Sequence, residues 1–360
     1  MSLRQDRRTF LKQTIGAAGA GLVVPLVAAC TATAPQPAAG PTTAPAAAPT
    51  TAPAAGSAVT RVSYAYASPN GLHFVASVGG EKPELAHKFG VEFDLLTTTN
   101  SPNAVNALVG GSVNVAAVTP DSAWPAQDKA PDAKQLFAVA DGTPYVLLGQ
   151  PDIKKASELK GKTLGVSALV GGADTAAMKI MLLESGVNPT DYTLVQAGAI
   201  SDRTAGLKAK TIDAVAQLEP QATILRDAGF AEIDNANNYA ALKGVHTIVL
   251  LSKTGWYENN PDVAANFVRA WDAITRWIYD PANKDELAAI SKKAFGGSDA
   301  GAQAVYNLHV VSKSVSQNLR INEKFMQQFV ENQQKAGATN LPTDAMKYVD
   351  SSLVSRVLNA

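Results

Sequence analysis

The residue best suited to covalent chemistry is Cys30, the only cysteine in the 360-residue chain. It follows Val27-Ala28-Ala29, and this small, apolar segment resembles a lipobox, in which the cysteine is acylated and becomes the first mature residue. A single cysteine allows no disulfide within one chain and leaves none for a metal site or a nucleophile. We therefore predict that Cys30 is the attachment site of a lipid.

The residues before Cys30 have the composition of an export signal. Arg7-Arg8 and the following Thr9-Phe10-Leu11-Lys12 resemble the twin-arginine motif. The apolar run from Ile15 to Ala29 is shorter than the roughly 20 residues that span a bilayer, so it fits a signal peptide better than a permanent membrane helix. We predict a signal peptide over 1–29 and a lipoprotein on the outer face of the cytoplasmic membrane, in the periplasmic or extracytoplasmic space.

Motifs of enzymatic chemistry are missing from the sequence. Its four histidines, His73, His87, His246 and His309, do not form a His/Glu cluster with zinc spacing. It contains neither a G-x-S-x-G elbow nor a P-loop. We therefore predict no catalytic residue, no metal and no cofactor.

Short polar loops form the other chemical feature, and each follows a predicted strand. Their hydroxyl, amide and carboxylate groups, together with the Gly171-Gly172 pair, can hold a small solute. The candidate ligand-binding residues are Ser68, Asn70, His73, Thr98, Ser101, Thr119, Asp121, Ser167, Gly171, Gly172, Asp174, Gln217 and Glu219.

Several of these residues have a structural alternative. Ser101, Asp121 and Asp174 are also good helix caps, and His73 could be a surface or packed histidine. We favour Glu219 as a ligand contact, because Pro220 restricts its loop and the preceding strand directs it to the cleft. Outside the candidates, Arg203 is interpreted as a solvated helix residue.

The elements that position these loops alternate short apolar runs with amphipathic stretches, a pattern typical of α/β proteins. In such proteins ligands lie beyond the carboxyl ends of the strands, where helix N-termini offer unpaired N–H groups. Ser101-Pro102 is expected to start one helix, Gly186 to end another, and Val263 to Ile278 to form one apolar helix face that includes Trp271. Strands are expected at 59–65, 91–96, 113–118, 135–140, 145–149, 163–166, 192–196, 214–217 and 246–252.

An internal repeat supports this organisation. Residues 107–123 and 206–222 align without a gap, and each segment reads as a helix end, a turn, a small-residue strand and a loop containing proline. Two copies of one helix–strand–loop unit predict two similar lobes. The alternative is that the turns and loops common to all α/β proteins produce the same pattern.

Composition limits the remaining possibilities. Residues 31–58 are almost entirely Ala, Pro, Thr and Gly, so 30–58 is predicted to be a lipid anchor followed by a disordered linker. The chain has 31 basic and 31 acidic residues and no basic run, which argues against nucleic acid as a partner.

These features together resemble the periplasmic solute-binding proteins of ABC importers, in the branch for sulfonates, nitrate, taurine or thiamine-precursor pyrimidines. The resemblance covers roughly 60–300 and is clearest at Ala156-Ser157-Glu158-Leu159-Lys160-Gly161-Lys162-Thr163-Leu164-Gly165-Val166 and the Gly171-Gly172 loop that follows. It implies a type II periplasmic-binding-protein fold, in which each lobe is a sheet flanked by helices and the C-terminal helices pack on the first lobe.

The resemblance also implies a domain division and a function. Lobe 1 would comprise 59–149 with 246–360, and lobe 2 would comprise 150–245, with crossings near Gly149-Gln150 and Lys243–His246. The protein, expected to be a monomer, would close on a small organic solute and deliver it to an ABC permease and its ATPase.

The class of ligand stays open among a sulfonate, a nitrate-like anion and an aminopyrimidine-like heterocycle. Asp121, Asp141, Asp174 and Glu219 give the loops an acidic tendency, which favours a neutral or cationic ligand with N–H donors. The alternatives are a thiamine-pyrimidine-synthase-like enzyme and a tethered ligand-sensing domain; the cysteine-rich iron motif of the former is missing here.

Overall fold

The computed structural model describes residues 59–358. The predicted signal peptide, the lipid site Cys30 and the Ala/Pro/Thr-rich linker lie outside the described residues. No helix within 59–358 is long and apolar enough to cross a membrane.

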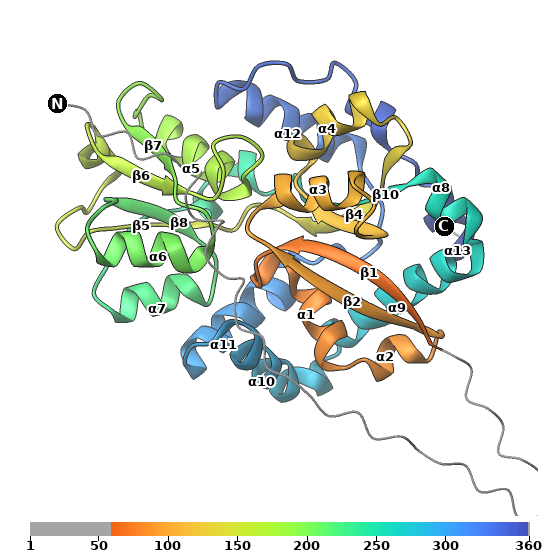
Figure 1. Cartoon of the computed structure of the whole chain (residues 1–360). Coiled ribbons are helices and arrows are strands. Elements are labelled where there is room, and N and C mark those ends of the chain that lie inside the picture. Colours follow the sequence, from red (N-terminus) through yellow and green to blue (C-terminus); the bar gives the residue numbers. More distant parts are fainter. Residues whose placement is uncertain (1–58, 359–360) are drawn as a thin grey trace, which may run out of the picture. The chain divides into compact units, whose positions relative to one another are not determined.

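Two separate five-stranded sheets, each covered by helices on both faces, organise these residues (Figure 1). The first has the order β2-β1-β3-β10-β4 and the second the order β7-β6-β8-β5-β9. Their strands are β1 (Thr60–Ala67), β2 (Val91–Thr98), β3 (Val115–Val118), β4 (Ala133–Asp141), β5 (Val146–Gly149), β6 (Thr163–Val166), β7 (Thr193–Gln196), β8 (Ala214–Gln217), β9 (Ala231–Asn235) and β10 (His246–Lys253).

The two sheets share one topology. In the first sheet, β1 pairs in parallel with β2 and β3, and β10 runs antiparallel beside β3. In the second sheet, β6 pairs in parallel with β7 and β8, and β5 runs antiparallel beside β8. We therefore call β1 and β6 the first, β2 and β7 the second, and β3 and β8 the third strand of each sheet. This confirms the predicted α/β class with a sheet in each half.

The repeat read from the sequence is present in space. Helix α3 (Ser101–Val109) and strand β3 correspond, at the 99-residue offset of the aligned segments, to α6 (Ile200–Lys208) and β8. Equivalent helix–strand units therefore occupy equivalent places in the two sheets.

All strands expected from the sequence are found, but β9 was missed. Its sequence, Ala-Glu-Ile-Asp-Asn, has no apolar run, and it lies at the edge of the second sheet beside β5. An edge strand needs fewer buried side chains than a central one, so its periodicity is weak.

The helices agree with the expected caps in one case and differ in another. Gly186, after α5, has φ +76°, as expected for a left-handed helix end. The N-cap of α3 is Asn100 instead of Ser101, because the Asn100 side chain accepts a hydrogen bond from the Asn103 N–H at 3.0 Å. The other helices are α1 (Phe74–Glu81), α2 (Glu84–His87), α4 (Pro120–Lys129), α5 (Ala173–Glu184), α7 (Gln221–Asp227), α8 (Thr254–Asn259), α9 (Pro261–Tyr279), α10 (Lys284–Phe295), α11 (Asp299–Tyr306), α12 (Glu323–Lys335) and α13 (Ser352–Leu358).

One predicted crossing between the sheets is misplaced. The sequence predicts it near Gly149-Gln150, but β5 pairs with β8 and β9 of the second sheet. The chain therefore leaves the first sheet after Asp141 and enters the second at Val146. The return falls between Asn235 and His246, which includes the predicted segment. The ranges of the two lobes stay a prediction, with the first crossing moved to the segment between Asp141 and Val146.

The C-terminal helices pack on the first sheet, as expected. Helix α12 contacts β10, and α13 contacts β4 and α9. In addition, α12 contacts α5 and α11 contacts α7, so these late helices also reach helices of the second sheet.

Candidate ligand-binding site

A small cavity lies between segments that follow strands of the first sheet and segments that follow strands of the second. Its main walls are the segments that follow the first two strands of each sheet, which are β1 and β2 in one and β6 and β7 in the other. It is lined by Ala67, Ser68, Asn70, Leu72, His73, Thr99, Asn100, Ser101, Tyr145, Ser167, Gly171, Gly172, Ala173, Asp174, Gly198, Ile200, Arg203 and Ile248. We call this the inner cavity.

The structure brings together many of the candidate residues at this cavity. They are Ser68, Asn70, His73, Ser101, Ser167, Gly171, Gly172 and Asp174. Thr98 lies next to it, in an adjoining outer hollow that shares Ser68, Thr99 and Ile200 with the inner cavity. Ligand binding by these residues stays a prediction.

The charged group of the cavity is an ion pair between Arg203 and Asp174. Their side chains are 5 % and 3 % exposed, and Nη1 of Arg203 donates to Oδ2 of Asp174. The backbone N–H of Ser167 donates to the same carboxylate at 2.9 Å, and the Ser167 hydroxyl donates to its other oxygen. The carboxylate of Asp174 is thus engaged by both Arg203 and Ser167.

Arg203 retains hydrogen-bonding capacity. Its Nη2 lies 3.4 Å from Oε1 of Gln217, a long contact, and its buried Nε–H has no partner within the described residues. A guanidinium fixed by a carboxylate on one edge can use its remaining donors for an anionic or acceptor group of a ligand. The earlier interpretation of Arg203 as a solvated residue is therefore wrong.

Two helix N-termini add to this donor character. Helices α5 and α6 begin beside the cavity, and the residues at their N-cap positions provide no side-chain cap. In α6 the Asp202 carboxylate accepts from the N–H of the N-cap residue Ala199 at 3.3 Å, which leaves the first-turn N–H groups themselves without a side-chain acceptor among the described residues. Uncapped first-turn N–H groups and the helix dipole favour a negative group at such a position.

The other titratable groups that line the cavity, His73 and Tyr145, add no charge near neutral pH. Burial lowers the pKa of His73 to about 3, so its imidazole is neutral. Burial also raises the pKa of Tyr145, with the charge of Asp174 acting in the same direction, so its hydroxyl stays protonated. The charges of Arg203 and Asp174 balance each other.

The loops after the third strand of each sheet do not line the inner cavity. Thr119, buried after β3, donates its hydroxyl hydrogen bond to the carbonyl oxygen of Gly171 at 3.0 Å. Gln217, at the end of β8, is fully buried and supports Arg203. Asp121 lines a separate hollow with Trp124 and Lys179, and burial raises the pKa of its carboxyl.

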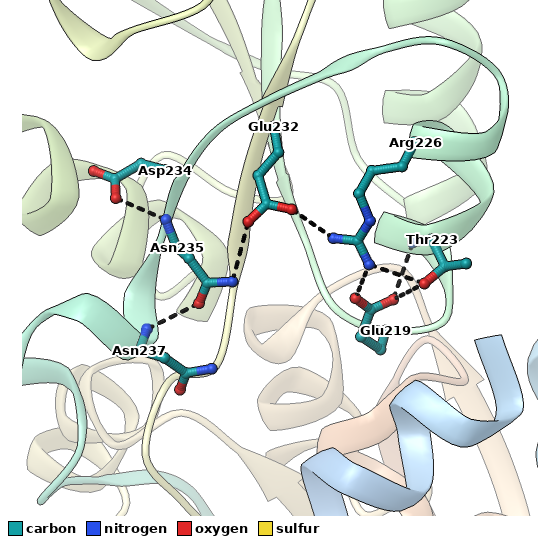
Figure 2. Close-up of polar contacts among 7 residues, drawn as sticks. All are labelled: Glu219, Thr223, Arg226, Glu232, Asp234, Asn235 and Asn237. Carbon is teal, nitrogen blue, oxygen red and sulfur yellow. Dashed lines mark hydrogen bonds and ion pairs between the residues drawn. The ribbon is translucent and has the colours of Figure 1, made fainter. Parts of the chain in front are cut away.

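Glu219, the favoured candidate, is oriented toward α7 (Figure 2). Its carboxylate accepts from the N–H of Thr223 at 2.9 Å and from the Thr223 hydroxyl at 2.8 Å, and it pairs with Arg226. It lines neither the inner cavity nor the outer hollow. The prediction of its position is therefore wrong: the first turn of its own helix offers the carboxylate nearer donors than the cleft does.

Glu219→Ala is expected to lower stability by about 1–2 kcal/mol, because it removes the acceptor for an N-terminal N–H of α7 and a partly buried ion pair. Ligand affinity should be unchanged. Glu232→Ala is the control, since it removes the more exposed partner of Arg226 and should cost less than about 0.5 kcal/mol. Urea unfolding and titration calorimetry on both variants check this, and a loss of affinity in Glu219→Ala alone would contradict it.

Size limits what the inner cavity can enclose. Its volume is about 40 Å³, enough for a few water molecules, whereas organic ligands occupy pockets of roughly 300–1,000 Å³. The outer hollow measures about 630 Å³ and is lined partly by apolar side chains, among them Ile200 and Phe295. In this arrangement a polar group of a ligand fits the inner cavity only if the rest of the molecule extends into the outer hollow.

Several residues of the cavity were missed by the sequence interpretation, above all Arg203, Tyr145 and Ile200. The repeat contained the signal for two of them, because α6 corresponds to α3 and its first turn must lie opposite Ser101. Tyr145 precedes β5 at the crossing between the sheets, and no motif marks it.

Comparison with known proteins gives a family and a fold. Residues 87–283 match the family model described as NMT1/THI5 like. The ligand-binding component of an ABC-type import system from Staphylococcus aureus, solved with zinc bound, is 15% identical with a TM-score of 0.68, over 83% of this chain and 99% of that one. The alkanesulfonate-binding protein SsuA from Xanthomonas axonopodis pv. citri, bound to MOPS, is 14% identical with a TM-score of 0.63, over 83% of this chain and 98% of that one.

The same fold also occurs in an enzyme. The desulfurization enzyme DSZB is 14% identical with a TM-score of 0.59, over 83% of this chain and 99% of that one. The comparison with curated proteins found no match to this chain. These likenesses confirm the predicted periplasmic-binding-protein fold.

Proposed function

Because this chain belongs to the NMT1/THI5-like family, we propose that it is the extracytoplasmic solute-binding protein of an ABC importer. It would capture a small organic solute between lobes built on its two sheets and deliver it to a permease and its ATPase. The observation that carries this proposal is the inner cavity, whose walls come from the same strand ends of both sheets and which contains a buried arginine with a free donor.

The cavity favours an anionic or acceptor group on the ligand. Arg203 and the uncapped starts of α5 and α6 all present donors. The acidic residues that suggested a cationic ligand are engaged elsewhere: Asp174 with Arg203, Glu219 with Arg226, and Asp141 with His246 at 2.7 Å. We therefore propose a small organic anion, with a sulfonate as the first choice over the heterocycle favoured by the sequence alone.

Attachment to the membrane is part of the proposal. Export through the twin-arginine motif and acylation of Cys30 would hold a monomeric binding protein on the outer face of the cytoplasmic membrane, near its permease. The rival functions are an enzyme, since the enzyme DSZB has a similar fold, and a tethered sensor. For an enzyme that depends on a cysteine, residues 31–360 supply none.

The experiment is a thermal-unfolding screen of the full chain with ethanesulfonate, benzenesulfonate, nitrate and 4-aminopyrimidine. A ligand at a hundredfold excess over its dissociation constant stabilises the folded state by about 2.7 kcal/mol. For a domain of this size each kcal/mol raises Tm by roughly 2–4 °C, so a bound sulfonate should raise it by about 5 °C or more. Stabilisation by 4-aminopyrimidine and by none of the anions would contradict the proposed ligand class.

A further inference from the structure

Helix α11 contacts helix α7 of the second sheet through a glycine, which has no side chain. Gly301 is buried in α11 and faces Pro220, which precedes α7. A Cβ atom added at Gly301 would lie 2.9 Å from Cβ of Pro220, closer than real Cβ atoms approach one another. Because the proline ring is rigid, α11 and α7 can come this close only while residue 301 is glycine.

This contact joins the parts of the molecule on either side of the cavity. Helix α11 packs on α10, and α10 packs on α1 of the first sheet, whereas α7 covers the second sheet. Close by, Nε2 of Gln221 in α7 donates to the carbonyl oxygen of Phe295 in α10 at 3.2 Å. In the described structure these two contacts hold α11 and α10 against α7.

We propose that Gly301 sets the affinity of the protein for its ligand without touching it, by permitting the α11–α7 contact in the closed arrangement. The inference rests on the proposed binding function. Neither Gly301 nor Pro220 lines the inner cavity or the outer hollow. A substitution that destabilises only the closed state must lower the affinity for every ligand by the same factor. A substitution at a ligand contact instead changes the preference among ligands.

Gly301→Ala tests the contact with little confusion from folding. Gly301 lies inside a helix and its φ is not in the left-handed region, so alanine suits the backbone and has the higher helix propensity. Gly171 also approaches the first sheet, with an added Cβ 2.8 Å from Cβ of Ser122, but its φ of +73° would make alanine strained there. Gly255 of α8 is the matched control, because a Cβ there meets nothing closer than 4.0 Å.

Affinities for ethanesulfonate and benzenesulfonate are measured by titration calorimetry on the wild type, Gly301→Ala and Gly255→Ala. An extra carbon in a packed contact opposes closure. We therefore expect Gly301→Ala to lower the affinity for both ligands about tenfold and to leave the ratio of the two affinities unchanged. Gly255→Ala should match the wild type. A Gly301→Ala protein that binds as tightly as the wild type, or whose ligand ratio changes, would overturn the inference.

A second measurement needs no ligand. With Cys30 replaced by serine, the full chain has no cysteine, so Asn106→Cys and Lys208→Cys place spin labels on exposed positions of α3 and α6. Pulsed electron paramagnetic resonance should show longer distances between the two labels in Gly301→Ala than in the protein without that substitution. Gln221→Ala, which removes the bond to Phe295 without adding bulk, should act in the same direction.

The two measurements separate the possible failures. If the wild type binds no anion but Gly301→Ala lengthens the distances, the proposed ligand class is wrong and the closure role of Gly301 stands. If the distance distributions of Gly301→Ala and Gln221→Ala both match the wild type, the closure role is wrong whatever the ligand.

Discussion

Arg203→Gln is expected to abolish measurable binding of the ligand and to lower the free energy of unfolding by about 3–5 kcal/mol. The loss of binding follows from the removal of a guanidinium that lines the cavity and whose Nε–H has no partner among the described residues. The loss of stability follows because Asp174, which is 3 % exposed, would keep a buried charge without its counter-ion. Urea unfolding and titration calorimetry measure the two effects on the same preparation.

The double variant Arg203→Gln with Asp174→Asn distinguishes the two roles. Removing both charges eliminates the unpaired buried carboxylate, so most of the lost stability should return. Binding should stay absent, because the donor for the ligand is still missing. A double variant that regains affinity would show that Arg203 is only the structural partner of Asp174.

Trp271→Ala is expected to lower the free energy of unfolding by about 3–5 kcal/mol. The Trp271 side chain is fully buried in α9, and its ring centroid lies 5.3 Å from that of Phe137 and 5.7 Å from that of Tyr64. Phe93 and Phe267 pack against the same ring. Such a cluster cannot collapse fully around the missing indole, so a cavity adds to the lost burial.

Trp256→Ala is the matched control for this core prediction. Trp256 is half-buried in the short helix α8, so its truncation should cost clearly less than that of Trp271. The midpoints of urea unfolding compare the two variants. Equal costs would mean that the aromatic cluster around Trp271 is not a main source of stability.

The sequence predicts the framework of this protein well, because the framework depends on local patterns. The aligned segments 107–123 and 206–222 predicted two equivalent units, and α3–β3 and α6–β8 are those units. The apolar face around Trp271 predicted a core helix, which is α9. Helix and strand periodicities are set by burial on one face, and burial can be read from residue types alone.

The candidate site was predicted only in part, since its polar contacts join residues that are far apart in sequence. Arg203 and Asp174 are separated by 29 positions, and nothing local to either residue indicates the ion pair. Glu219 failed for the opposite reason, because it forms local contacts with Thr223 and Arg226 that outweigh any attraction to the cleft. The crossing after Asp141 also depends on strand pairing, and β5 carries no mark of the sheet it joins.

The preference for an anion illustrates how pairing changes an electrostatic argument. Counted along the sequence, Asp121, Asp141, Asp174 and Glu219 make the loops acidic. In space, Asp141, Asp174 and Glu219 have cationic or imidazole partners, and Asp121 lines a different hollow. A ligand responds to the groups left unpaired in the cavity, and the described cavity leaves donors.

The most direct test of the binding function is titration calorimetry of the full chain with ethanesulfonate, on the wild type and on Arg203→Gln. We expect one ligand per chain for the wild type and no measurable heat of binding for Arg203→Gln. Binding of 4-aminopyrimidine in place of the sulfonate, or sulfonate binding that Arg203→Gln leaves unchanged, would show that Arg203 does not hold an anionic ligand.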